Sequence, residues 1–143
     1  MREILFRGKR LQGGEWVEGY FFKSDINKKE RESGKATLIF TPDCDTFIMV
    51  PECHNSFMVV SDTVGQYTGL KDKNGKRIFE GDIAKVLQGK DKDIAYVGFE
   101  NGAFMLYPKT GNIYERTLWS YWYNDWDVEV IGNITDNPEL LEK

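Results

Sequence analysis

The sequence has little of what several classes of protein depend on. Its 143 residues include one histidine and two cysteines, too few for a disulfide framework and little for histidine catalysis or a histidine metal site. No apolar run approaches the roughly 18 residues of a membrane-spanning helix. The first ten residues are charged and lack the apolar stretch of a signal peptide. We therefore expect a cytoplasmic protein with free thiols and no membrane partner.

An excess of basic residues is also missing. The chain carries 19 Lys and Arg against 23 Asp and Glu, a net charge of -4, whereas a dedicated duplex-DNA binder usually shows a basic surface. Residues 1–35 have nine basic and six acidic side chains, and residues 100–143 have three and eight. This asymmetry allows ordinary solvated faces, head-to-tail self-association, or two separate partner surfaces.

What the chain does contain is typical of a β protein. Hydrophobic residues make up 41% and aromatic residues 14%, enough for a packed core. Short stretches rich in β-branched or aromatic residues alternate with Gly, Asn and Asp every 8–12 residues or so, which predicts strands. The predicted strands are residues 16–22, 36–40, 46–50, 57–60, 78–79, 83–87, 94–99, 103–107 and 128–134. The charged residues 23–35 predict a loop, and residues 42–43 and 52–55 predict turns.

The predicted fold class is mainly β, a β-rich α+β protein in two parts. The polar run 61–65 ends in Gly65 and suggests a boundary, with an N-terminal β-rich subdomain over 1–62. Residues 63–143 hold five short strands with tight turns at 73–76, 100–103 and 109–112. That number of strands suits an SH3-like or OB-like small barrel, and we favour an SH3-like barrel with a C-terminal tail.

Two short segments predict helix. Trp119, Trp122 and Trp126 fall at i, i+3 and i+7, one face of a helix, so one or two helical turns should precede the last strand. In the tail, Asn137 can cap a helix with Pro138 at its first position.

Residues with potential chemistry are scattered. Cys44, Cys53 and His54 offer at most three nitrogen or sulfur ligands, whereas a structural zinc site needs four. We expect two buried free cysteines and a histidine in a turn. The carboxylate pairs Glu80/Asp82 and Asp125/Asp127 carry no mark of a general acid and base and are interpreted as surface charge. We predict no enzyme, no metal and no cofactor.

One cluster has the composition of a binding site. Five large rings lie within eight residues, namely Trp119, Tyr121, Trp122, Tyr123 and Trp126. Three interpretations are open: a core in which the three tryptophans point inward and the two tyrosines outward, a protein interface, or a groove for single-stranded bases or a proline-rich peptide. The acidic charge of residues 100–143 disfavours phosphates near these rings.

Three parts of the chain together resemble the YopX family, small proteins encoded by bacterial phages and prophages. The central part, residues 63–83, reads TVGQYTGLKDKNGKRIFEGDI. The start (MREI, FRGK and WV-GY within residues 1–20) and the end (EVIGNI and NPELL within 129–141) agree with it in order. Ala84 departs from the family pattern, which more often has Val there, and the rings at 119–126 are not part of that pattern.

The resemblance implies a phage-derived gene, a bacterial cytoplasmic location and a C-terminal SH3-type barrel, and it implies no known catalytic activity. From the residues themselves, Gly65, Gly69, Gly75 and Gly81 are turn or close-approach positions. Asp82, just before a strand, is expected to accept backbone N–H bonds in an Asx-turn.

The leading functional hypothesis is a non-enzymatic accessory protein that binds a protein: itself as a homo-oligomer, or a phage or host partner. The alternative is a nucleic-acid-binding small-barrel protein. It would use Arg2, Arg7, Lys9, Arg10 and the turn at 71–77 around an aromatic platform.

Overall fold

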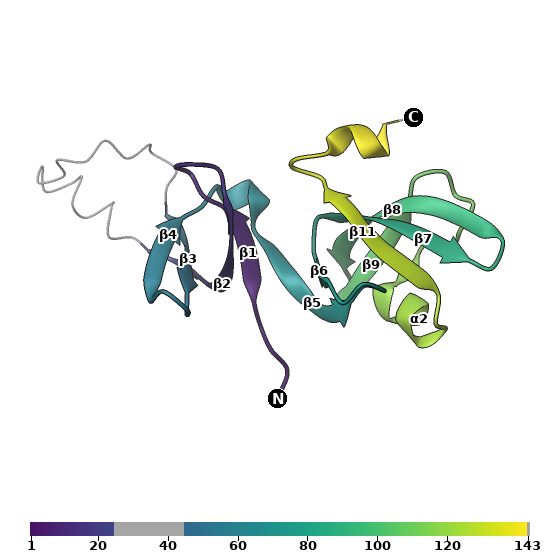
Figure 1. The fold of residues 1–143 in the computed structure, drawn as a ribbon, viewed down its shortest axis with the longest axis horizontal. Coiled ribbons are helices and arrows are strands. Elements are labelled where there is room, and N and C mark those ends of the chain that lie inside the picture. The colour runs from purple at the N-terminus through teal and green to yellow at the C-terminus, as the bar shows by residue number, and fades with distance from the viewer. Residues whose placement is uncertain (25–44, 143) are drawn as a thin grey trace, which may run out of the picture. The chain divides into compact units, whose positions relative to one another are not determined.

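The computed structural model describes residues 1–24 and 45–142, and within them the chain is mainly β, as predicted (Figure 1). These described residues also form two 3-10 helices and one α-helix: η1 (Ser61–Thr63), α2 (Leu118–Tyr123) and η2 (Pro138–Leu141). The strands are β1 (Phe6–Lys9), β2 (Trp16–Lys23), β3 (Thr46–Val50), β4 (Asn55–Met58), β5 (Gly65–Lys71), β6 (Arg77–Phe79), β7 (Asp82–Gln88), β8 (Asp91–Glu100), β9 (Ala103–Pro108), β10 (Arg116–Thr117) and β11 (Asp127–Asn133).

The strands form two antiparallel sheets. One has the order β4-β3-β2-β1-β5-β6 and the other β10-β9-β8-β7-β11. In the second sheet β10 and β11 are the two ends, and over residues 45–142 no pairing joins them, so this sheet is not closed into a barrel. The chain divides into two compact units, Ile4–Gln66 (the N-terminal unit) and Met1–Glu3 with Tyr67–Lys143 (the C-terminal unit). The subdomain boundary at 62/63 stays a prediction.

Most predicted strands are confirmed where the structure describes them. Three strands were missed: β1, β5 and β10. β1 (FRGK) and β5 (GQYTGLK) contain glycines and few β-branched residues, and β10 has two residues, so each lacks the pattern that marks a strand. The predicted strand at 36–40, the turn at 42–43 and nearly all of the loop at 23–35 lie outside the described residues.

In the N-terminal unit, the segment that follows β4 pairs with the residue that follows β1. After β4 the chain forms a bridge between Arg10 and Val59, and Leu11 N–H donates to Met58 O at 3.0 Å. Ile48 and Val59 are buried inside this turn of sheet. A Cβ at Gly8 would lie 3.0 Å from the side chains of both, so a glycine lets β1 approach them closely.

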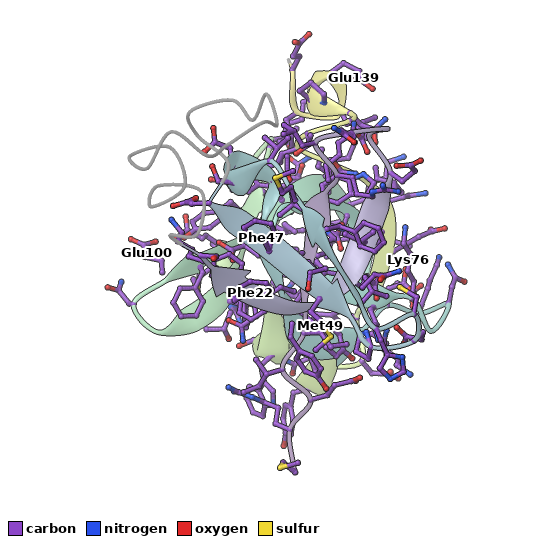
Figure 2. The ribbon with its side chains drawn as sticks, turned by 90° about the vertical axis from the view of Figure 1, so that its left-hand side faces the viewer. Phe22, Phe47, Met49, Lys76, Glu100 and Glu139 are labelled. Atoms are coloured by element: carbon purple, nitrogen blue, oxygen red, sulfur yellow. The ribbon has the colours of Figure 1, made fainter. Side chains whose placement is uncertain are left out.

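The opposite face of the strands β2, β3 and β4 carries exposed apolar side chains. Cross-strand pairs place Phe22 beside Phe47 and Tyr20 beside Met49. The rings of Phe22 and Phe47 stack with centroids 5.3 Å apart, and Figure 2 looks onto this face. Tyr20 is 51% exposed. We call Tyr20, Phe22, Phe47 and Met49 the outer face of the N-terminal unit.

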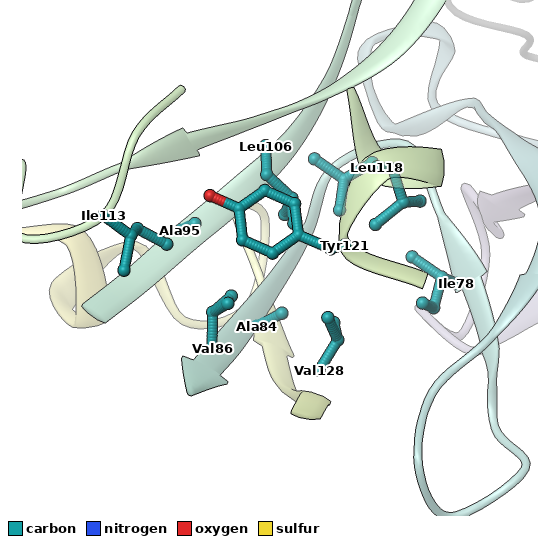
Figure 3. Packing of buried hydrophobic residues seen from close by; sticks show 10 residues of the cluster. Ile78, Ala84, Val86, Ala95, Leu106, Ile113, Leu118, Tyr121 and Val128 are labelled. Carbon is teal, nitrogen blue, oxygen red and sulfur yellow. The ribbon is translucent and has the colours of Figure 1, made fainter. Parts of the chain in front are cut away.

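The C-terminal unit has the larger core, centred on the fully buried Tyr121 (Figure 3). The side chains around it come from five strands, α2 and a loop. The buried members are Ile78, Ala84, Val86, Ala95, Val97, Leu106, Ile113, Leu118, Tyr121 and Val128. The predicted hairpin at 100–103 joins two of these strands, with positive φ at Asn101 (51°) and Gly102 (79°).

Buried carboxylates hold the turns of this unit. The two oxygens of Asp72 accept from the N–H groups of Asn74 and Lys76, each at 2.9 Å, and of Val130 in β11, at 3.0 Å. The turn at 73–76 is therefore present as predicted, but only Gly75 of the Asn-Gly pair has positive φ. The Asp72 carboxylate replaces the second left-handed residue as the device that fixes the turn.

Asp82 corrects one expectation. It is 1% exposed and not surface charge. It does accept a backbone N–H, as expected: its Oδ2 accepts from the N–H of Phe79 at 2.7 Å, three residues earlier. The tail is as predicted in part: Pro138 occupies the first helical position of η2, but Asn137 makes no side-chain cap and instead accepts from Asn133 N–H at 3.4 Å.

Candidate functional site

The aromatic cluster lies on and after α2, a helix of six residues. The predicted helical turns before the last strand are thus confirmed. Asn124 closes the helix, with its N–H and its Nδ2 both donating to Ser120 O. Asp125 then takes a left-handed conformation with φ of 55°. The chain leaves the helical path there, so Trp126 does not continue the helix face of Trp119.

The two sides of α2 differ from the core interpretation. Leu118 and Tyr121 point inward, and the hydroxyl of Tyr121 donates to the carbonyl oxygen of Tyr114. Burial raises the pKa of Tyr121, which keeps this donor protonated. Trp119 is 56% exposed, which corrects the expectation that it points inward and Tyr121 outward. Leu118 and Tyr121, three positions apart, form the inward face of this six-residue helix. Trp119, one position after Leu118, is therefore turned away from the core.

The exposed side of the helix presents two stacked rings. Trp119 and Tyr123, one helical turn apart, have centroids 4.9 Å apart and an interplanar angle of 22°. Tyr123 is 68% exposed, which agrees with its predicted outward direction. Only the backbone of Trp122 belongs to the described part of the chain. Neither ring of the stacked pair contributes to the buried core.

Trp126 packs against the edge of the buried core. Its ring meets the buried ring of Tyr121 edge to face at 4.9 Å and 67°. The Arg116 guanidinium lies 5.8 Å from its centroid. The cation contact and the aromatic contact fix the indole, and Trp126 as a whole is half-buried.

A pocket of about 270 Å³ opens beside Trp126. Its lining combines apolar side chains, among them Leu70 and Val128, with charged side chains of both signs: Lys71, Asp72, Lys73, Asp125 and Asp127. Neither the Asp125 nor the Asp127 carboxylate forms a hydrogen bond or an ion pair within residues 1–24 and 45–142. The ammonium of Lys73, which also lines the pocket, pairs with Glu129 at 3.1 Å, and this hydrogen bond raises the pKa of Lys73.

We name Trp119, Tyr123, Trp126, Asp125 and Asp127 the acidic aromatic site. Its members are the two exposed stacked rings and three residues that line the pocket, namely the half-buried indole of Trp126 and two exposed carboxylates. Exposed aromatic rings of this kind are enriched where a protein segment binds. Sequence reasoning found the rings from their density. Asp125 and Asp127 are exposed, as their interpretation as surface charge predicted, but their place in the lining of the pocket beside Trp126 could not be read from the sequence.

The remaining candidate residues lie elsewhere. Cys53 is exposed, which corrects the expectation of a buried thiol, because it lies in the turn after β3. His54 is in that turn, as predicted, with φ of 54°. Cys44 lies outside the described residues.

Several cations of the nucleic-acid alternative contact neighbouring side chains. Arg7 lies 4.9 Å from the ring of Trp16 and Arg10 lies 4.4 Å from that of Phe57. Arg10 also pairs with Glu15. In the turn after β5, Lys73 pairs with Glu129 and Arg77 with Glu3, while Lys71 and Lys76 are exposed.

Within the described residues, no helix has the length and apolar character needed to cross a membrane. The molecule belongs to the class of two-sheet, mainly β proteins. The family model described as YopX protein matches residues 5–142, and the chain is a member of that family.

A solved structure is similar to this chain. The crystal structure of protein EF1440 from Enterococcus faecalis matches with a TM-score of 0.54 and 24% sequence identity, over 99% of this chain and 100% of that one. At this identity the match shows the shared fold. No curated protein matches the sequence.

Proposed function

We propose that the protein is a non-enzymatic, phage-derived accessory protein that acts by binding another protein surface through the acidic aromatic site. We also propose that its C-terminal unit is a variant of the SH3-like small barrel, with β7, β8 and β9 as its central strands. The observation that carries the proposed function is the stacked pair Trp119 and Tyr123, which stands in solvent while Leu118 and Tyr121 supply the packing of α2.

Large exposed rings favour a protein partner for energetic reasons. Burial of a Trp or Tyr side chain at an interface removes extensive apolar surface from water, and such residues dominate measured binding energies. Stacking the two rings on each other reduces the conformational entropy lost on binding, since their rotamers are already restricted. Phosphates are disfavoured by the exposed carboxylates of Asp125 and Asp127, which follow Tyr123 in the sequence.

The first partner to test is a second copy of the chain. We would measure the mass in solution by size-exclusion chromatography with light scattering, over a wide range of protein concentration. The double variant Trp119→Ser/Tyr123→Ser is compared with the wild type and with Tyr20→Ser, a matched control with a 51% exposed ring in the N-terminal unit. An oligomer that dissociates at least about tenfold more readily in the double variant alone supports self-association.

If the wild type is a monomer, the same three proteins are used as bait in lysate of a prophage-carrying host, with and without nuclease. Protein capture that survives nuclease and is lost in the double variant supports the proposal. Capture that collapses with nuclease, or that is equal for the wild type and the double variant, overturns it.

A further inference from the structure

A second cavity of the C-terminal unit has the opposite charge. Its volume is about 380 Å³, in the range of roughly 300–1,000 Å³ typical of small-molecule sites. Three lysines line it from separate segments: Lys85 of β7, Lys92 of β8 and Lys109 after β9. We call this cavity the lysine pocket.

Most of its positive charge is available. Lys85 and Lys92 are exposed and form no hydrogen bond or ion pair within the described part of the chain. The Lys109 ammonium donates one hydrogen bond, to Leu140 O at 3.1 Å, and retains two further protons. A ligand could therefore meet three ammonium groups.

The single carboxylate of the lining does not neutralise these lysines. Asp93 is buried, and the hydroxyl of Thr110 donates to its Oδ2 at 2.7 Å. The backbone N–H groups of Ile94, Thr110 and Asn112 also donate to its two oxygens, at 2.8 to 3.2 Å. Burial alone would raise the pKa of Asp93, but these donors together lower it. Its charge is thus committed to the turn at 110–112.

The remaining wall is aliphatic. Ile94 and Ile131 line the pocket, and Ile131 is 39% exposed. Ile131 lies where the register of β11 shifts against β7, between Val130 and Gly132. Such a bulge re-aims one side chain of a strand. An exposed isoleucine beside free ammonium groups gives the pocket an apolar part and a cationic part.

We propose that the lysine pocket binds a small organic anion whose carboxylate or phosphate contacts Lys85, Lys92 and Lys109 and whose apolar body lies on Ile94 and Ile131. Charge complementarity selects the anionic group, and the aliphatic wall selects against a bare inorganic ion. This site is separate from the acidic aromatic site and does not depend on the proposed function.

The test is an NMR titration of the full chain labelled with ¹⁵N. The probes are octanoate and octyl phosphate, which present a carboxylate and a phosphate on an apolar body, with inorganic phosphate and octylammonium as comparisons. We expect shifts of the amides of residues 85, 92–94, 109–112 and 131 with one or both organic anions, at dissociation constants below about 1 mM. Which one binds more tightly identifies the anionic group.

The matched variants separate the site from general charge. Lys85→Gln/Lys92→Gln should weaken binding about tenfold or more, because two charge-assisted contacts are lost. Lys71→Gln/Lys76→Gln, which removes two exposed lysines of the same unit outside the pocket, should leave binding unchanged.

Absence of shifts up to about 10 mM of both organic anions would overturn the proposal. So would equal binding of inorganic phosphate or octylammonium, or full binding by Lys85→Gln/Lys92→Gln. Because Trp119→Ser/Tyr123→Ser leaves the lysine pocket intact, it should bind the anion normally whether or not the acidic aromatic site binds a protein.

Discussion

The two units share one way of bringing their strands together and differ in another. In the N-terminal unit, glycines allow the strands to approach closely. A Cβ at Gly8 would crowd the side chains of Ile48 and Val59, and a Cβ at Gly19 would overlap the backbone of Met49. In the C-terminal unit, Asp72, Asp82 and Asp93 are buried and accept backbone N–H groups. Among the described residues, no buried aspartate belongs to the N-terminal unit. Buried aspartates therefore set the C-terminal unit apart in the described part of the chain, whereas glycines that admit a close neighbour occur in both units, as Gly98 and Gly132 show.

The largest expected effect is that of Gly19→Ala. A Cβ at Gly19 would overlap the carbonyl oxygen of Met49 and lie 2.8 Å from its carbonyl carbon. Because backbone cannot yield as a side chain can, we expect a loss of about 3 kcal/mol in the free energy of unfolding of the N-terminal unit. Amide hydrogen exchange over residues 4–24 and 45–66 measures it.

Gly98→Ala is the matched change in the C-terminal unit. Its Cβ would lie 2.7 Å from the ring of Tyr107, a side chain that can move aside. The loss should be clearly smaller than for Gly19→Ala. Equal losses would contradict the view that a glycine packed against backbone tolerates a Cβ less well than a glycine packed against a side chain.

Next in size is Asp72→Ala, which removes the acceptor of three backbone N–H groups. We expect the C-terminal unit to lose about 2 kcal/mol, with faster hydrogen exchange at Asn74, Lys76 and Val130. Asp72→Asn keeps one acceptor oxygen and should recover part of this loss. If exchange over residues 4–66 rose as much as at these three amides, the change would not act through the turn.

Acid should lower the stability of the C-terminal unit more than that of the N-terminal unit. The folded pKa of Asp93 is lowered from its ordinary value of 3.8, so its ionised form stabilises the fold. This stabilisation is present above pH 3.8 and is lost as the pH falls through the lower, folded pKa. Hydrogen exchange measured from about pH 5 down to about pH 2 should show that the free energy of unfolding of the C-terminal unit decreases as the pH falls.

Asp93→Asn is the control for acid sensitivity. It is less stable at neutral pH because the amide accepts fewer of these hydrogen bonds, and its stability should change less on acidification than that of the wild type. An identical acid profile in both proteins would assign the sensitivity to other carboxylates.

The smallest effect concerns a surface contact of the C-terminal unit. The Tyr107 hydroxyl donates to Glu100 at 2.6 Å, and this hydrogen bond raises the pKa of Tyr107 to about 12. Glu100→Gln should return it toward 10. An alkaline absorbance titration, with Tyr107→Phe to assign the signal, measures the shift. Glu115→Gln should leave it nearly unchanged, because Glu115 acts only through space.

Local pattern predicted more of the fold than of the site. Strands with alternating apolar residues, the hairpin at 100–103 and the helix before β11 follow from spacing and turn chemistry. The direction of the α2 side chains does not, because it depends on where a helix of one to two turns begins, and a shift of one residue exchanges Trp119 for Leu118. The lysine pocket could not be predicted for a related reason: its three lysines lie on separate segments and meet only through the pairing of β7 with β8 and of β8 with β9.

The hydrogen bond between Asp72 and Val130 also has a consequence for biosynthesis, since its partners are 58 residues apart. A nascent chain makes the turn at 72–76 early but completes its carboxylate contacts only after β11 has left the ribosome. Until then β7, which pairs with both β8 and β11 in the finished sheet, exposes one hydrogen-bonding edge. Such an edge recruits strands of other chains. Slow translation or truncation before residue 127 should therefore cause aggregation, because β7 then lacks its β11 neighbour.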